Sequence, residues 1–94
     1  MVSKTQVVEV MSELAQALIH DYPSSSLTEY VCESLTTIKK SNGVAFTGQL
    51  QYFFNHAPIV KTSDNLKFNE KTRKLWDKLF SLNELGNNLW GASL

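Results

Sequence analysis

Residues 66–94 read LKFNEKTRKLWDKLFSLNELGNNLWGASL, and this stretch decides the fold. Asn69 can accept a hydrogen bond from a backbone N–H and so cap a helix, and Glu70 suits the positive end of the helix dipole. Five large apolar side chains follow within an arc of about 160°, which is a broad face for burial. They are Leu75, Trp76, Leu79, Phe80 and Leu82. The stretch therefore predicts a helix that needs other helices behind it.

The same helix carries a candidate binding surface for another protein. Three lysines stand at helical spacing along one margin of the apolar arc. The break at residues 86–88 (GNN) predicts that the helix covers roughly residues 70–86. Residues 87–94 are expected to form a short tail whose tryptophan folds back against the helices, and a frayed terminus is the alternative. The candidate partner-binding residues are Lys71, Lys74, Lys78, Trp90 and Leu94.

Capping motifs and helix breakers predict three more helices before this one. Residues 3–6 (SKTQ) and 26–29 (SLTE) read as capping boxes, and each precedes an apolar stripe of helical period. Pro23 ends the first helix, and Gly43 supplies a left-handed residue that ends the second. The third helix is expected to stop near Ala57, because a proline follows it. The predicted helices cover roughly residues 4–20, 27–41, 44–57 and 70–86, within one domain of residues 1–94.

These elements predict an all-α fold, an antiparallel up-down four-helix bundle with a short C-terminal tail. Short connections between helices favour antiparallel neighbours. The longest connection is expected at residues 58–68, where residues 61–65 (KTSDN) read as an exposed loop. One residue from each helix is expected to be largely buried: Leu14, Leu35, Phe53 and Leu79.

Composition indicates a small globular domain with an uneven charge distribution. Apolar residues make up 43% of the 94 residues and the net charge is zero, which excludes a disordered chain and a strong polyanion binder. The chain through Ile38 carries one cation and five acidic residues, whereas the remainder carries eight cations and four acidic residues. Either the two halves balance each other within the fold, or the basic half faces a partner.

The sequence favours a cytoplasmic location. Cys32 is the only cysteine, so no internal disulfide can form, and a reducing compartment is the simple inference. The first residues lack the apolar segment of a secretory signal, and no apolar run approaches the roughly 18 residues of a membrane span. A peripheral position at the inner face of the membrane is compatible with this expectation. A monomer is favoured.

Motifs for catalysis, cofactors or metals are not found, so we expect a binding protein and not an enzyme. Cys32, His20 and His56 fall in three separate segments, which is neither nucleophile–base nor metal-ligand spacing. The four glycines are isolated and form no phosphate loop. Nucleic-acid binding is not expected, because residues 44–57, the candidate recognition helix, contain no lysine or arginine.

The chain resembles the immunity proteins of pediocin-like (class IIa) bacteriocins, the enterocin A immunity group. The shared features are the length, four amphipathic segments with a proline-marked break after the first, and the string at residues 66–70 (LKFNE). That string resembles the family's apolar-basic-apolar-cap-acid lead into helix 4, which continues here to a Gly-Asn turn and an aromatic tail. Two departures are the long connection at residues 58–68 and a tail that stops four residues after Trp90.

The resemblance implies a role as well as a fold. Members are cytosolic antiparallel four-helix bundles of lactic acid bacteria and related streptococci. They protect the cell from a bacteriocin whose receptor is the membrane part of the mannose phosphotransferase system. The implied partner is therefore the bacteriocin-bound receptor, engaged from inside the cell without destruction of the peptide. Specificity is attributed to the C-terminal half, which corresponds here to residues 70–94.

The sequence is also compatible with two other classes of protein. One is a small helical regulator or antitoxin that binds DNA or a toxin. The other is a purely structural bundle that associates with itself. Salt dependence of nucleic-acid binding separates the first from an immunity protein, because phosphate contacts weaken steeply as salt rises. Light scattering addresses the second.

Overall fold

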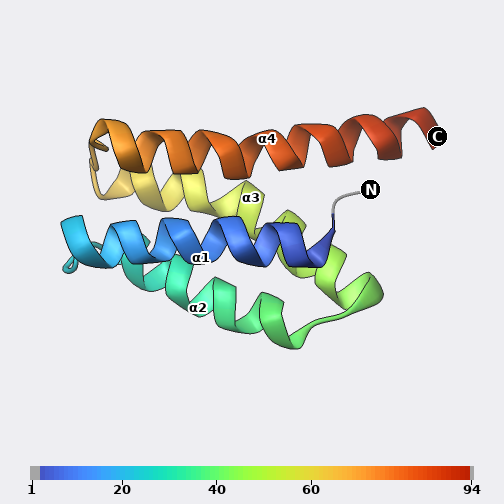
Figure 1. The fold of residues 1–94 in the computed structure, drawn as a ribbon, viewed down its shortest axis with the longest axis horizontal. Coiled ribbons are helices and arrows are strands. Elements are labelled where there is room, and N and C mark those ends of the chain that lie inside the picture. The colour runs from blue at the N-terminus through green and yellow to red at the C-terminus, as the bar shows by residue number, and fades with distance from the viewer. Residues whose placement is uncertain (1–2, 94) are drawn as a thin grey trace.

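The chain folds into four α-helices in a computed structural model that describes the backbone of residues 3–93 and the side chains of residues 3–82. The helices are α1 (Lys4–Asp21), α2 (Ser26–Lys40), α3 (Gly43–Ser63) and α4 (Glu70–Ser93). Successive helices run in opposite directions (Figure 1). The backbones of α1 and α2, of α1 and α4, and of α2 and α3 pack closely. The predicted all-α, up-down four-helix bundle is confirmed.

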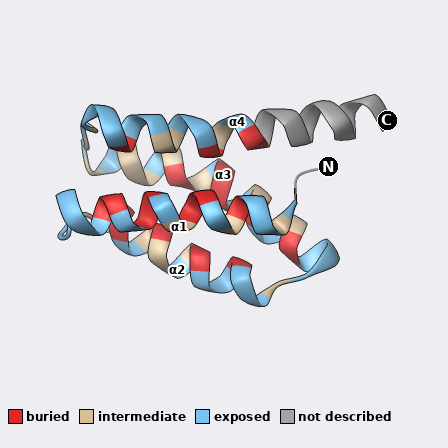
Figure 2. Ribbon diagram, viewed as in Figure 1, coloured by how far each residue is buried: buried red, intermediate tan, exposed pale blue. Residues whose placement is uncertain are grey.

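The apolar core lies between the helices, where their buried faces meet (Figure 2). The four predicted core residues are buried, with exposed fractions of 0–9%: Leu14, Leu35, Phe53 and Leu79. The spacing of apolar residues placed them correctly because helical residues three and four apart share one face. Each helix therefore contributes at least one large side chain to a common interior.

Aromatic side chains bridge α3 and α4, whose backbones are not among the closely packed pairs. Phe80 of α4 stacks on Trp76 with ring centroids 4.4 Å apart, and it meets the edge of Phe54 of α3 at 5.0 Å. Phe53 lies 6.2 Å from Phe80 and stacks at 5.9 Å on Tyr30 of α2. Large rings fill the wider space between these helices, and ring pairs at these separations add stability beyond their buried area.

A residue far along the chain completes the N-terminus of α2. The N-cap is Ser25, so the predicted capping box at residues 26–29 is wrong by one position. The Ser25 hydroxyl accepts from the Leu27 N–H at 3.1 Å and donates to the Asp64 carboxylate at 2.7 Å. The same carboxylate oxygen accepts from the Leu27 N–H at 3.2 Å. Asp64 follows the end of α3, so sequence reading around α2 alone could not find it.

Acid should destabilise the protein through Asp64. The Ser25 hydroxyl and the Leu27 N–H donate to its carboxylate, and these bonds lower the pKa of Asp64 below its ordinary value. A carboxyl with a lowered pKa in the folded state stabilises the fold above about pH 4, and this contribution disappears as pH falls through the folded pKa. We expect Asp64→Asn to reduce stability at neutral pH and to flatten the acid side of the stability profile.

Urea midpoints measured from neutral pH down to about pH 2 test this expectation, because linkage predicts where stability changes. Asp77→Asn, an exposed position on α4, controls for the loss of one negative charge. An acid profile of Asp64→Asn that superimposes on the wild-type profile would contradict the assignment.

The third helix continues past its proline, contrary to the sequence prediction. α3 ends at Ser63 with Pro58 inside it, so both the predicted stop near Ala57 and the long loop at residues 58–68 are wrong. The connection to α4 is residues 64–69. Proline inside a helix costs about 3 kcal/mol, but burial after it can offset that cost. Here Val60 packs against the core, one turn beyond the buried Ala57.

A Schellman motif ends α3. Asn65 has a left-handed φ of 52°, its N–H donates to the Thr62 carbonyl at 2.9 Å, and the Leu66 N–H donates to the Lys61 carbonyl at 3.2 Å. These two bonds satisfy carbonyls that the helix end leaves free, and an apolar contact commonly accompanies them. Leu66 and Val60 both pack against the core. Asparagine is one of the few non-glycine residues that adopts this conformation readily.

The fourth helix is longer than predicted. α4 runs to Ser93, so the predicted end at Gly86 and the separate tail over residues 87–94 are wrong for the backbone through Ser93. Glycine and asparagine inside a helix each cost only about 1 kcal/mol or less relative to alanine, and no proline forces a stop. The predicted docking of Trp90 lies outside the described side chains, and the assignment of Leu94 lies outside the described residues altogether.

Candidate functional site

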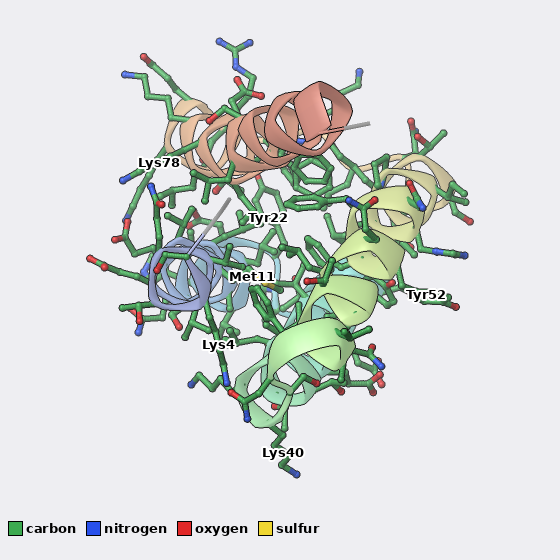
Figure 3. All side chains as sticks on the ribbon, turned by 90° about the vertical axis from the view of Figure 1, so that its right-hand side faces the viewer. Lys4, Met11, Tyr22, Lys40, Tyr52 and Lys78 are labelled. Carbon is green, nitrogen blue, oxygen red and sulfur yellow. The ribbon has the colours of Figure 1, made fainter. Side chains whose placement is uncertain are left out.

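The two flanks of α4 differ in chemistry because they face different helices. Trp76 and Phe80 lie on the flank toward α3, in the aromatic contacts described above. Lys71, Lys74 and Lys78 are exposed on the opposite flank. Figure 3 shows Lys78 on the side of the molecule where α1 lies. The predicted grouping of the three lysines along one edge therefore has a defined neighbour, the first helix.

A groove lies between α1 and α4 beside two of these lysines. It encloses about 620 Å³. Ala17 of α1 is buried and Leu75 of α4 is half-buried, so they supply an apolar surface within the groove. The lining residues are Glu13, Gln16, Ala17, His20, Lys71, Lys74 and Leu75. Its charged rims carry opposite signs, with a carboxylate on α1 and ammonium groups on α4.

The lysines differ in how far neighbouring acids already neutralise them. Lys74 pairs with Glu70 at 3.2 Å, and both side chains are about three-quarters exposed, so the pair contributes little stability. Lys71 lies close enough to Asp21 to lower the pKa of that carboxyl further. Lys78 forms no ion pair with any side chain that the structure describes. Among the described side chains, acids therefore partly neutralise Lys71 and Lys74 but not Lys78.

Hydrogen bonds between the end of α1 and the residue before α4 position the lysine edge of α4. The Asp21 carboxylate contacts His20 Nδ1 at 2.7 Å and accepts from the Asn69 amide at 2.9 Å. These two bonds, that of His20 first, lower the pKa of Asp21 below its ordinary value. Asn69 also accepts from the Thr72 N–H at 2.9 Å, which confirms the predicted cap.

The string at residues 66–70 packs against the same end of α1. The Tyr22 hydroxyl donates to the Lys67 carbonyl at 3.1 Å and accepts from the Asn69 N–H at 2.7 Å. The Phe68 ring lies 6.1 Å from Tyr22 and 5.3 Å from Trp76. Residues 66–70 therefore contact Tyr22 at the end of α1 and Trp76 of α4. Its apolar and polar residues act mainly in placing the first turn of α4 beside α1.

This arrangement is suited to binding. The lysines can contact carboxylates, while Ala17 and Leu75 can contact an apolar side chain. No hydroxyl or thiol nucleophile lines the groove. Among the described residues, no group of three His, Cys, Asp or Glu side chains could hold a metal ion. Within the same residues, no helix combines the length and the apolar character that crossing a membrane requires.

Sequence reasoning missed the contribution of α1 to the groove. Glu13, Gln16 and His20 are spaced three and four residues apart, so they share one face beside the buried Ala17. That spacing was visible in the sequence, but the partner helix was not. The other two predicted binding residues, Trp90 and Leu94, lie outside the described side chains.

No family model, curated protein or solved structure matches the chain. Any functional conclusion therefore depends on the site itself and on the resemblance carried by its sequence features.

Proposed function

We propose that this protein is a bacteriocin immunity protein that protects a cell from a pediocin-like (class IIa) bacteriocin. It acts in the cytoplasm by contact with the bacteriocin-bound membrane components of the mannose phosphotransferase system. The observation that carries the proposal is the lysine edge of α4 beside the α1–α4 groove. The four-helix bundle and the resemblance at residues 66–70 support it.

The lysine edge has a definite task in this proposal. Lys71, Lys74 and Lys78 orient the protein on an acidic surface of the receptor complex, and an apolar side chain of the partner enters the groove against Leu75. Exposed charges mainly accelerate and orient docking, whereas affinity comes from the desolvated centre of an interface. Lys78 contributes most, because no described carboxylate competes for it.

Replacing all three lysines with glutamine should weaken protection while leaving the fold intact. Loss of electrostatic steering lowers association rates by roughly tenfold or more, so cells should survive roughly tenfold less bacteriocin. The measurement is survival of a sensitive host that expresses each variant, against a panel of class IIa bacteriocins. Circular dichroism and thermal melting confirm folding.

A matched control variant distinguishes the effect of where the lysines lie from the effect of losing three positive charges. Lys39, Lys40 and Lys67 are also exposed but lie away from the groove, so their replacement by glutamine removes the same three charges elsewhere. This control variant should protect as the wild type does. Equal protection by both triple variants would remove the lysine edge from the proposal. Failure of the wild-type protein against every member of the panel would remove the immunity function itself.

The alternative of a DNA-binding regulator is not favoured by the geometry. A helix that reads DNA normally brings cations to phosphates. α3 has no lysine or arginine before Lys61, whose ammonium lies over the Phe68 ring at 4.9 Å from its centroid. A mobility-shift assay at low salt with the same purified protein provides the counter-test.

A further inference from the structure

The outer face of α3 carries a heptad seam that no other part of the described chain covers. Five exposed residues recur at spacings of 3, 4, 3 and 4, which is the period of a coiled-coil contact. They are Ala45, Gly48, Tyr52, Asn55 and Ile59. Tyr52 is 56% exposed and Ile59 is 63% exposed, although both are large and apolar. Figure 3 shows Tyr52 on the outer side of α3, away from the core residue Met11.

The α3 segment that carries this face contributes no charged side chain, and Glu33 of α2 lines a pocket beside Gln49 and Tyr52. Residues 43–60 contain no Asp, Glu, Lys or Arg, although 18 of the 94 residues in the chain are charged. A strongly acidic partner would find no lysine or arginine in this segment. In a contact between two copies across a two-fold axis, residues near the axis meet their own symmetry mates, so a charge there would meet a like charge. The seam residues of α3 carry no such charge, which is compatible with self-pairing.

When two copies of this face meet in antiparallel orientation, large seam residues of one copy lie opposite small seam residues of the other. Ala45 precedes Tyr52 by seven residues and Ile59 follows it by seven, so an axis at Tyr52 places a small residue opposite a large one at both ends. Gly48 and His56 lie four residues to either side of Tyr52. A Cβ added at Gly48 would meet nothing within 4 Å, so open space is available for the opposing imidazole. The His56 ring stacks on Tyr52 at 3.8 Å, which makes one compact projection.

We propose that two copies of this chain associate weakly through their α3 helices, antiparallel, with the two-fold axis at Tyr52. Ile59 of each copy packs on Ala45 of the other, and the Tyr52–His56 stack of each copy packs over Gly48 of the other. From Ala45 to Ile59 the seam is about 21 Å long, and with a helix width of about 10 Å its footprint is about 200 Å². Stable interfaces bury roughly 800 Å² per partner, so this contact gives a dimer only at high protein concentration.

Sedimentation equilibrium of the purified full chain tests the pairing without reference to its cellular role. The weight-average mass should rise above 10.6 kDa toward twice that value as the concentration increases from about 20 µM to about 1 mM. Ile59→Lys places a charge against Ala45 of the other copy, where no acidic residue of the 43–60 segment can pair with it, and should keep the mass at 10.6 kDa throughout. Ile19→Lys is the matched control, because Ile19 is an isoleucine of α1 that is 53% exposed. This variant should associate as the wild type does.

Cysteine pairing tests the direction of the two helices. In a Cys32→Ser background, Ala45→Cys and Ile59→Cys chains are mixed and oxidised under mild conditions. The antiparallel arrangement predicts mainly disulfides between unlike chains, because these two positions face each other only in that arrangement. A wild-type mass that stays at 10.6 kDa, association that survives Ile59→Lys, or disulfides mainly between like chains each overturns the proposal. Binding of this face to lipid vesicles by a protein that stays monomeric would also overturn it.

Discussion

Replacing Phe53 with alanine should lower the free energy of unfolding by about 3–5 kcal/mol. The side chain is 1% exposed, and its ring contacts Tyr30, Phe54 and Phe80, which belong to three helices. Truncation removes the burial of a large ring and leaves a cavity that three helices cannot all collapse to fill. For a domain of this size, such a loss is a large part of the total stability. Urea denaturation followed by circular dichroism measures it.

The neighbouring residue provides the control. Tyr52 is an aromatic residue of the same helix that is 56% exposed, so Tyr52→Ala should change stability by no more than about 0.5 kcal/mol at low protein concentration. The two substitutions differ in burial and not in residue class. If Phe53→Ala and Tyr52→Ala had similar midpoints, the inward face of α3 would be assigned incorrectly.

Replacing Pro58 with alanine should stabilise the protein by up to about 3 kcal/mol. Pro58 stands inside α3 and cannot donate to the carbonyl four residues earlier, and alanine restores that donor. Alanine also has the highest helix propensity. The gain is smaller if α3 is bent around the proline ring and does not relax. A rise in the urea midpoint and in the melting temperature is the expected readout.

The other proline allows a comparison within the same chain. Pro23 lies in the turn between α1 and α2, where a proline restricts the unfolded chain without costing a helical hydrogen bond. Pro23→Ala should therefore destabilise by about 0.4–1 kcal/mol, the opposite sign. Destabilisation by Pro58→Ala would show that the ring makes packing contacts worth more than the restored hydrogen bond.

The helices and the core could be predicted from local pattern, but the end of α3 could not be predicted from the proline rule. Pro58 favoured a stop, whereas the apolar stripe continued through Ala57 to Val60, and burial outweighed the cost of proline. The extra length of α4 has a similar origin. Gly86 lowers the stability of the helix by only a small amount. A penalty of this size does not end a helix unless another local structure is more stable at that point.

Of the two helices that line the candidate groove, only the contribution of α4 could be predicted from the sequence. The lysines share a flank of one helix, so their periodicity grouped them. The groove also needs Glu13 and His20 of α1, and pairing of helices distant in sequence is a tertiary property. The same holds for Asp64. It accepts a hydrogen bond at the N-terminus of α2, and the residues beside Asp64 in the sequence do not indicate this contact. Interactions of this kind leave no periodic signal.

The bond from Ser25 to Asp64 also has a consequence for the order of events during folding. Asp64 is separated from Ser25 by 39 positions, so the first turn of α2 obtains its full set of acceptors only after α3 has been completed. The hairpin of α1 and α2 therefore cannot reach its final stability by itself. Coupling of this kind favours cooperative, all-or-none unfolding over the independent loss of single helices. A nascent chain emerging from the ribosome would gain this stabilisation only once the whole of α3 is free to pack.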